Sequence, residues 1–163
     1  MILYHGSNLI VSEPKLVPQN RFLDFGYGFY TTTNKKQALG FADKVTKRRK
    51  NGTPTVSIYE IEEVKAFVEC SILQFETPNE EWLDFVSDNR AGKYKGTAYD
   101  FIYGPVANDD VYTTFALYTS GVLSKEQTIE ALKVKKLYNQ LVLTSEKALT
   151  YLKFIGTVSE GEF

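Results

Sequence analysis

One histidine and two short glycine-bearing segments hold the side chains best suited to bind a ligand. The segment Tyr4–Ser7 reads Tyr-His-Gly-Ser and ends a short apolar run. The segment Asp24–Thr32 places two glycines before Phe-Tyr-Thr-Thr. A glycine allows close approach to the backbone, and an imidazole beside a hydroxyl offers donor and acceptor groups together. The two segments predict a slot with aromatic walls and one imidazole. The alternative is that His5 is a hydrogen-bonded structural residue at a strand end.

The surrounding sequence predicts short strands and capped helices that position these segments. Strands are expected where β-branched and aromatic residues gather, and helices where a capping residue precedes an apolar periodicity. The expected strands are residues 2–5, 28–32, 55–60, 66–75, 99–103, 140–143 and 152–158. The expected helices begin at Thr33 or Asn34, at the capping box Thr77–Glu80, at Asn108 or Asp109, at the capping box Ser124–Gln127, and at Thr144 or Ser145. Residues 8–27 are expected to form a loop.

This order of elements predicts one α+β domain over residues 1–163, with strands and helices segregated rather than alternating. The 163 residues are enough to bury a core, and 43% hydrophobic with 24% charged residues is typical of globular proteins. The net charge of −1 argues against a protein that coats nucleic acid through phosphate contacts. It leaves open the recognition of a single nucleic-acid site.

The chain offers few residues for disulfides or metal sites. Cys70 is the only cysteine, so no internal disulfide framework or zinc cluster is expected. His5 is the only histidine, and no metal is predicted. A signal peptide and an apolar run of about 18 residues are both missing, so we expect a soluble cytoplasmic protein without membrane partners. The pair Gly26 and Gly28 precedes a strand-like segment rather than a helix, which argues against a Rossmann-type dinucleotide site.

In their order and spacing, the two glycine-bearing segments resemble the ADP-ribosyltransferase superfamily. The similar branch has a His, Tyr, Glu triad and includes diphtheria-toxin-like and poly(ADP-ribose)-polymerase-like enzymes. These motifs cover about residues 3–45 and the strand at 140–143. Residues 2–155 more narrowly resemble a family of small uncharacterised bacterial proteins that is thought to be toxin-like. The segments that carry this narrower resemblance are Trp82–Val86, Asn89-Arg90, Tyr99-Asp100 and Gly104–Asp109.

The resemblance implies a split two-sheet core with flanking helices, and NAD as the donor of ADP-ribose. His5 would bind the adenosine-side ribose hydroxyl and the carboxamide, Ser7 would lie near the nicotinamide, and Tyr30 would stack on its ring. A second aromatic residue of such enzymes falls at Phe41, for which core packing is the alternative. The implied cofactor-binding residues are His5, Gly6, Ser7, Gly28, Phe29, Tyr30 and Phe41.

The third triad position carries Gln140 where the family has glutamate, so the implied catalytic set is His5, Tyr30 and Gln140. A glutamine can hold a ribose hydroxyl, but it brings no negative charge to a developing cation. The lost charge is worth several kcal/mol of barrier, or orders of magnitude in rate. Three outcomes stay open: a slower mono-transferase, a transferase that borrows another carboxylate, or a protein that only binds. The candidate carboxylates are Asp24, Asp100 and Asp109, each of which a cap or turn also explains.

The expected function is NAD-dependent mono-ADP-ribosylation, without polymer formation, of an acceptor that the sequence does not name. A protein side chain, a nucleic acid and a small molecule all stay open as acceptors, and so does an antitoxin partner. The alternative is a catalytically silent NAD-binding or protein-interaction module. Basic residues at 44–50 are explained by a helix dipole or by a phosphate site. The candidate residues for acceptor or pyrophosphate are Arg21, Arg90, Asn108 and Asp109, with a surface arginine and a strand exit followed by a helix cap as the alternatives.

Overall fold

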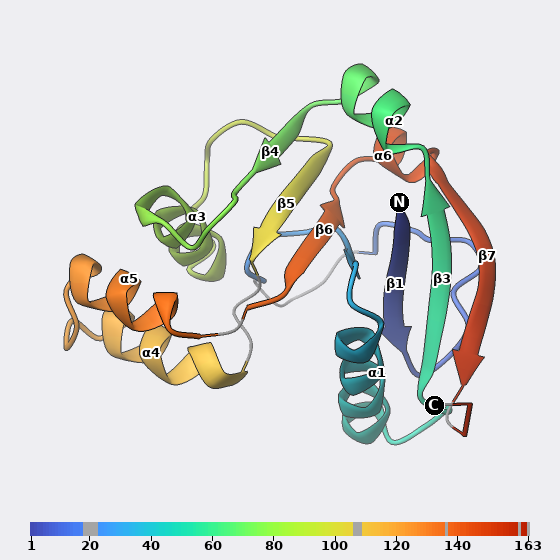
Figure 1. Cartoon of the computed structure of the whole chain (residues 1–163), viewed down its shortest axis with the longest axis horizontal. Helices are drawn as coiled ribbons and strands as arrows, with labels where there is room; N and C mark the ends of the chain where they lie inside the picture. The colour runs from blue at the N-terminus through green and yellow to red at the C-terminus, as the bar shows by residue number, and fades with distance from the viewer. Residues whose placement is uncertain (18–22, 106–108, 136, 160, 163) are drawn as a thin grey trace.

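The computed structural model describes residues 1–17, 23–105, 109–135, 137–159 and 161–162. Within them the chain forms seven strands and six helices, which confirms the α+β class (Figure 1). In chain order these are β1 (Ile2–Ser7), β2 (Phe29–Thr32), α1 (Lys35–Arg49), β3 (Thr55–Ile61), α2 (Glu63–Glu69), β4 (Ile72–Gln74), α3 (Glu80–Arg90), β5 (Phe101–Pro105), α4 (Asp109–Thr119), α5 (Lys125–Lys133), β6 (Asn139–Leu143), α6 (Glu146–Leu149) and β7 (Leu152–Ser159).

The strands form one hydrogen-bonded sheet in the order β4-β5-β6-β2-β1-β3-β7. Only the β4–β5 pair is parallel among the strands that the structure describes. The weakest joint lies between β1 and β2, whose ladder consists of the single pair Tyr4–Thr32, whereas six pairs join β1 to β3. Figure 1 shows β1, β3 and β7 on one side of this joint and β4, β5 and β6 on the other. The expectation of two sheets is therefore corrected to one continuous sheet with a narrow joint.

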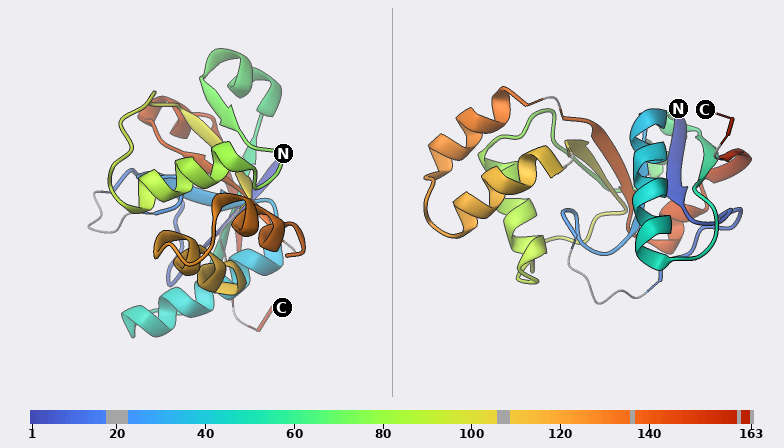
Figure 2. Two further views of the ribbon diagram at one scale, coloured as in Figure 1. Left: turned by 90° about the vertical axis from the view of Figure 1, so that its left-hand side faces the viewer. Right: turned by 90° about the horizontal axis from the view of Figure 1, so that it is seen from below.

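Each face of the sheet has its own core. Helices α3, α4 and α5 gather over the β4–β5–β6 part (Figure 2). They bury Trp82, Phe115 and Leu132 in one cluster with Ile102 and Val142 of the sheet. The second cluster lies on the opposite face, because it takes the alternate strand residues, and helices α2 and α6 contribute to it. Its members include Leu3, Phe29, Tyr59, Phe101, Leu141, Leu143, Ala66 and Ala148.

Local capping signals set most helix starts as the sequence predicts. Asn34 caps α1 by accepting from Gln37 N, and Ser124 forms a full capping box with Gln127. The predicted Thr77 box is wrong, since the side chain of Asn79 caps α3 by accepting from Trp82 N at 2.9 Å. A bend at residues 76–78 precedes the cap, and Asn79 N donates to the Thr77 carbonyl at 2.8 Å. Helix α4 begins at Asp109 as expected, but the predicted alternative cap, Asn108, lies outside the described residues.

The strand predicted over residues 66–75 is also wrong in its first half. That half belongs to α2, and only Ile72–Gln74 is a strand. Ala66 and Cys70 are buried four residues apart, and the Cys70 N–H donates to the Ala66 carbonyl. Val68, whose β-branched side chain favours a strand, is 80% exposed, and Val64 before the predicted strand is 79% exposed. Burial of the small residues at helical spacing overrides the β propensity of the valines.

Gly6 sets how closely α1 approaches β1. A Cβ at Gly6 would overlap the carbonyl oxygen of Ala38 and lie 2.8 Å from Ala42 N. Ala38 and Ala42 are themselves buried and pack with Val56. Only a residue without a side chain lets the helix backbone lie directly on the strand. The glycine of the Tyr-His-Gly-Ser segment therefore holds α1 against β1.

We expect Gly6→Ala to lower the free energy of unfolding by about 1–3 kcal/mol, because helix backbone must move to admit the methyl group. Gly40→Ala is the matched control on the same helix. A Cβ there would meet nothing within 4 Å, so it should raise stability by about 0.5–1 kcal/mol through helix propensity. Urea denaturation of both variants measures the difference. Equal stability of the two variants would contradict the role given to Gly6.

Candidate functional site

Three neighbouring elements bring the predicted triad to the middle of the sheet. Strand β6 pairs with β2, with Val142 opposite Tyr30 and Gln140 opposite Thr32. Because side chains alternate along a strand, Tyr30 and Gln140 share one face of the sheet. His5 lies on the other face, where its ring stacks on Phe29 with centroids 4.3 Å apart. The fold thus brings the three backbone positions together but divides the three side chains between two faces.

The imidazole of His5 spans the weak joint between β1 and β2. Met1 and Ile61 exchange both backbone hydrogen bonds at 3.0 Å, which sets the alternation along β1 and β3. The backbone N–H and C=O groups of His5 therefore point to β3, and those of Gly6 point toward β2. No ladder pair joins Gly6 to β2 in the described residues; instead His5 Nδ1 lies 2.7 Å from the Tyr30 carbonyl oxygen. A side chain takes the place of a ladder bond.

The contacts of His5 define its protonation. A carbonyl oxygen only accepts, so Nδ1 carries the proton and, in the neutral ring, Nε2 is left as an acceptor. Burial lowers the pKa of His5 below its ordinary value of 6.5; the Tyr30 carbonyl raises it by less, and Arg49 lowers it further. The half-buried ring is therefore neutral at pH 7, with one nitrogen able to accept from a hydroxyl.

Tyr30 uses its hydroxyl within the protein. The oxygen accepts from Phe25 N at 3.1 Å and donates to the carbonyl of Gly26. Gly26 has φ = +76°, a conformation that favours glycine. Burial, followed by the nearby Asp24 carboxylate, raises the pKa of Tyr30 far above its ordinary value of 10.0. The hydroxyl fixes the turn at 25–26, while the half-buried ring packs against the α3–α4–α5 core.

Gln140 carries a buried donor without an acceptor. Gln140 is 6% exposed, and its amide nitrogen Nε2 has no hydrogen-bond partner among the described residues. The neighbouring Thr32 is already engaged, since its hydroxyl donates to Gln37 Oε1 at 2.7 Å and accepts from Asn34 N at 3.1 Å. An unmet buried donor costs about 1–3 kcal/mol, and such exceptions require an explanation. Gln140 therefore holds a donor that a ligand can satisfy.

The remaining cofactor-binding candidates have structural contacts of their own. Ser7 is buried, and its hydroxyl lies 3.4 Å from Asn8 Oδ1, which accepts from Arg49 at 2.8 Å. A Cβ at Gly28 would lie 2.7 Å from Val142 Cγ1, so this glycine admits β6. Phe29 is 7% exposed beneath His5.

Phe41 lies on α1 and is 50% exposed, so the core-packing alternative for this residue is wrong. It follows Gln37 by four residues and therefore lies on the same side of the helix. Gln37 in turn reaches Thr32, the cross-strand neighbour of Gln140. Gln37 and Thr32 are neighbours of Gln140 that were not predicted from the sequence. A signal was present, because glutamine three residues after an asparagine cap marks a helix start next to β2.

Arg90 is held inside the protein rather than on its surface as the alternative expectation had it. Its Nε donates to Asp24 Oδ1 at 2.5 Å, and its guanidinium carbon lies 4.7 Å from the centre of the Phe115 ring. Asp100 accepts from Ser71 N and from the Ser145 hydroxyl at 2.6 Å, and these hydrogen bonds, with Ser145 the largest, lower the pKa of its carboxyl group. The carboxylates of Asp24 and Asp100 are therefore both engaged with partners inside the protein. Arg21 lies outside the described residues, and the side chain of Asp109 is likewise not described.

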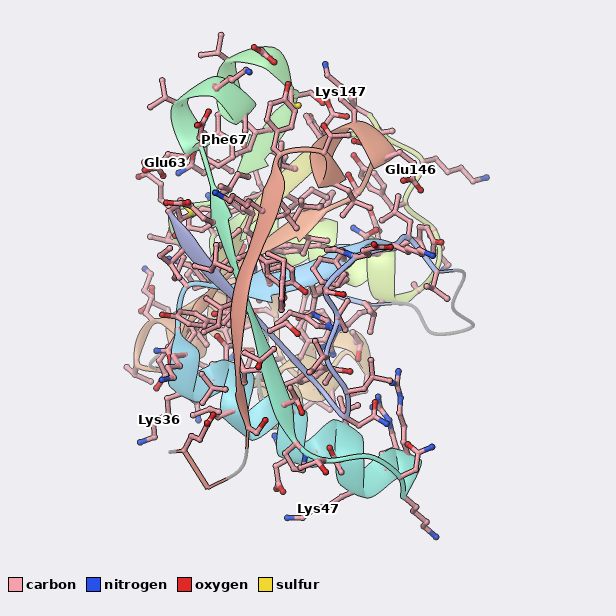
Figure 3. The ribbon with its side chains drawn as sticks, turned by 90° about the vertical axis from the view of Figure 1, so that its right-hand side faces the viewer. Lys36, Lys47, Glu63, Phe67, Glu146 and Lys147 are labelled. Atoms are coloured by element: carbon pink, nitrogen blue, oxygen red, sulfur yellow. The ribbon has the colours of Figure 1, made fainter. Side chains whose placement is uncertain are left out.

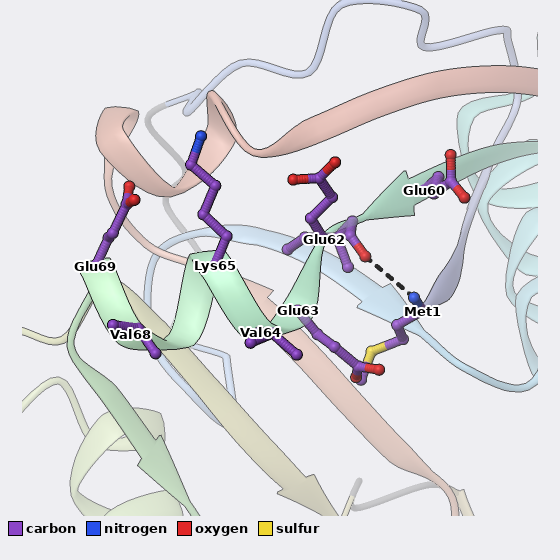
Figure 4. A pocket seen from close by; sticks show the side chains of 9 residues that line it. Met1, Glu60, Glu62, Glu63, Val64, Lys65, Val68 and Glu69 are labelled. Atoms are coloured by element: carbon purple, nitrogen blue, oxygen red, sulfur yellow. Dashed lines mark hydrogen bonds between the residues drawn. The ribbon is translucent and has the colours of Figure 1, made fainter.

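A separate surface cavity of about 660 Å³ lies beyond the start of β1, between Met1, the end of β3 and α2 (Figure 4). Four glutamates line it, together with Val64 and Val68. It is far along β1 from Gly6 and Ser7, and none of the predicted site residues contributes to it. The candidate site at β1, β2 and β6 is therefore defined by its side chains rather than by this cavity.

Neither a membrane-spanning helix nor a metal-binding cluster is found in the part of the chain that the structure describes. No helix there is long and apolar enough to cross a membrane. No group of three or more His, Cys, Asp or Glu side chains is placed to hold a metal ion.

The fold and the site together define an α+β domain with a neutral histidine at the β1–β2 joint. On the other face, at β6, lies an amide nitrogen without a partner among the described residues. Residues 1–154 match the family described as "Protein of unknown function (DUF3990)", and the chain belongs to that family. Searches of curated proteins and of solved structures gave no match.

His5 is the only histidine, so its ring proton gives an unambiguous NMR signal. We expect its titration midpoint below 6.5 in the folded protein and near 6.5 in urea. Because the unfolded chain binds this proton more readily, the free energy of unfolding should fall as the pH drops from about 6.5 toward the folded pKa. His5→Gln should lack that component. A folded midpoint at or above 6.5 would contradict the neutral, buried imidazole.

Proposed function

We propose that this protein is an NAD-dependent mono-ADP-ribosyltransferase. The observation that carries the proposal is the buried Gln140 amide, whose nitrogen has no partner among the described residues and lies on the same sheet face as Tyr30. The Tyr-His-Gly-Ser and Gly-Phe-Tyr-Thr-Thr segments, which resemble those of ADP-ribosyltransferases, lie on the adjacent strands β1 and β2.

The reaction breaks the bond between the nicotinamide nitrogen and the anomeric carbon of its ribose. An acceptor nucleophile forms the new bond to that carbon, and nicotinamide leaves with the electron pair. In this proposal neutral His5 accepts from a ribose hydroxyl through Nε2, and Gln140 donates to the nicotinamide-side ribose. Phe41 and the Tyr30 ring supply aromatic surfaces. Positioning and charge stabilisation are the contributions that such a reaction requires from a protein.

The missing glutamate has no evident replacement among the candidate carboxylates that are described. Asp24 is paired with Arg90, and Asp100 is engaged by two serines. A positive charge that develops at the anomeric carbon would meet only the Gln140 amide, so turnover is slow and polymer formation is not expected. Among the three outcomes, slow transfer and binding alone have more support than a borrowed carboxylate.

The second candidate function is NAD binding without turnover. The observation that favours it is the division of the triad, with His5 on one face of the sheet and Tyr30 and Gln140 on the other. A ligand would have to reach both faces through the β1–β2 joint to meet all three side chains. Release of nicotinamide from NAD separates the two candidates, because binding alone releases none.

Gln140→Met tests the unmet amide. It keeps the side-chain length and removes the buried donor, so the free protein should gain stability, by up to about 1–3 kcal/mol. The same change should abolish stabilisation by NAD, which at a hundredfold excess over Kd is about 2.7 kcal/mol for the unmodified protein. Thermal melting with and without NAD measures both effects.

Gln140→Glu is the companion change. It should keep NAD binding within a few-fold and raise nicotinamide release, since it restores a charge near the developing cation. If Gln140→Met still gains the full NAD stabilisation, Gln140 is a strand residue only. If NAD stabilises neither the unmodified protein nor any variant, the proposed function is wrong.

Tyr30 is expected to act through its ring. Tyr30→Phe should lose stability, because Phe25 N and the Gly26 carbonyl lose their partner, yet retain NAD binding. Tyr30→Ala should lose both stability and NAD binding. Isothermal titration with NAD, run well below each variant's melting temperature, separates the two effects. If Tyr30→Phe loses NAD binding, then binding depends on the turn that the Tyr30 hydroxyl holds, and not on the ring.

A further inference from the structure

Helix α1 concentrates the positive charge of the protein. Residues 35–50 contain seven basic residues and one acidic residue, out of 19 basic and 20 acidic residues in the chain. The remaining sequence therefore holds 12 basic and 19 acidic residues. One helix with its cap carries a formal charge of +6, and everything else carries −7. The near-neutral net charge hides this separation. The basic residues are Lys35, Lys36, Lys44, Lys47, Arg48, Arg49 and Lys50.

The helix dipole does not account for this charge. Basic residues complement the last turn of a helix, which explains Lys47, Arg48 and Arg49. The first turn favours acidic residues, but α1 has none there and begins instead with Lys35 and Lys36. Two lysines at that end are unfavourable for the helix itself. Basic residues therefore stand at both ends of α1, with none at 37–43, and the dipole explains only those at its C-terminal end.

The charged side chains face solvent. Ala38, Ala42 and Val45 form the buried side of α1, whereas Lys44, Lys47 and Arg48 are exposed. Figure 3 shows Lys36 and Lys47 projecting outward from α1. Lys47 pairs with Asp43 at 2.7 Å, but both side chains stay largely in water. A pair of that kind is weak and exchanges readily for a phosphate.

The basic side of α1 leads toward the candidate site. At 100° per residue, Gln37, Phe41, Lys44 and Arg48 follow one another along one side of the helix. Gln37 at the start of this row reaches Thr32 beside Gln140, and Phe41 next to it is half exposed. A polymer bound along Lys44 and Arg48 would therefore end at Phe41 and the β2–β6 strands.

We propose that α1 binds the phosphate backbone of single-stranded nucleic acid and delivers it as the acceptor to the site at β1, β2 and β6. The delivery rests on the proposed function, but the binding does not. A membrane surface fits less well, because the apolar side of α1 is already packed on the sheet and only Phe41 is exposed as a large apolar side chain of this helix. Cations beside an exposed aromatic ring are typical of single-strand binding.

The test measures fluorescence anisotropy of a labelled 20-nucleotide oligothymidylate in the absence of NAD. Binding should weaken at least about ten-fold between roughly 50 and 200 mM salt, as phosphate contacts require. Lys44→Gln with Arg48→Gln should reduce the slope of log K against log salt by about 1.4, since each single-strand contact contributes about 0.7. Lys35→Gln with Lys36→Gln is a second pair on the same helix and should act in the same direction.

Lys65→Gln with Lys153→Gln is the matched control. Both lysines are exposed, and their replacement changes the net charge equally, but they lie on α2 and β7. The control pair should leave the slope unchanged. The inference is overturned if the control weakens binding as much as the α1 pairs, if the oligonucleotide does not bind at about 50 mM salt, or if polyglutamate or phosphatidylserine vesicles compete as well as unlabelled oligonucleotide.

Nicotinamide release from NAD into water, measured without nucleic acid, keeps the two proposals apart. It should be the same for the Lys44 and Arg48 pair as for the unmodified protein, because neither residue belongs to the site. Nicotinamide release without oligonucleotide binding overturns only the role of α1. Oligonucleotide binding that depends on α1, without nicotinamide release, supports that role and overturns only the transferase proposal.

Discussion

The close contact between Gly6 and the backbone of α1 is the constraint on which the rest of the site depends. No side chain separates β1 from the helix, so α1 lies directly beside the joint where β1 meets β2. The same contact places Gln37 within reach of Thr32 and leaves Phe41 in solvent. It also fixes the row of cations along α1 relative to the strands. A bulkier residue at position 6 would separate the basic helix from the candidate site.

The joint itself is held by side chains where a sheet would ordinarily use its backbone. One ladder pair and the hydrogen bond from His5 to the Tyr30 carbonyl connect the two halves. The joint keeps its apolar support all the same, because the cluster that holds Leu3 and Tyr59 also holds Phe29 and Leu141 and so continues across it. The hydroxyl of Tyr30 then fixes the turn that follows the loop. The residues proposed to bind the ligand therefore also hold the structure together.

Local signals in the sequence predict most elements but not their arrangement. The caps at Asn34 and Ser124 and the strands around His5, Tyr30 and Gln140 follow from short motifs. The strand predicted over residues 66–75 is wrong in its first half because β-branched Val68 favours a strand, whereas buried Ala66 lies on a helix. The face on which each triad side chain lies depends on the register between distant strands, which no local pattern specifies. The exposure of Phe41 likewise depends on which side of α1 the sheet covers.

Gln140 is an unusual residue for its position in the sheet. A strand position at the centre of a sheet, between Thr32 and Gly104, is ordinarily filled by an aliphatic residue, as it is two residues later at Val142. An amide there costs stability unless something accepts its hydrogens. Within the described residues nothing does, although other buried side-chain donors and acceptors have partners. Under the proposed function, a ligand would accept from this amide on the face that Gln140 shares with Tyr30, whereas His5 lies on the opposite face of the sheet.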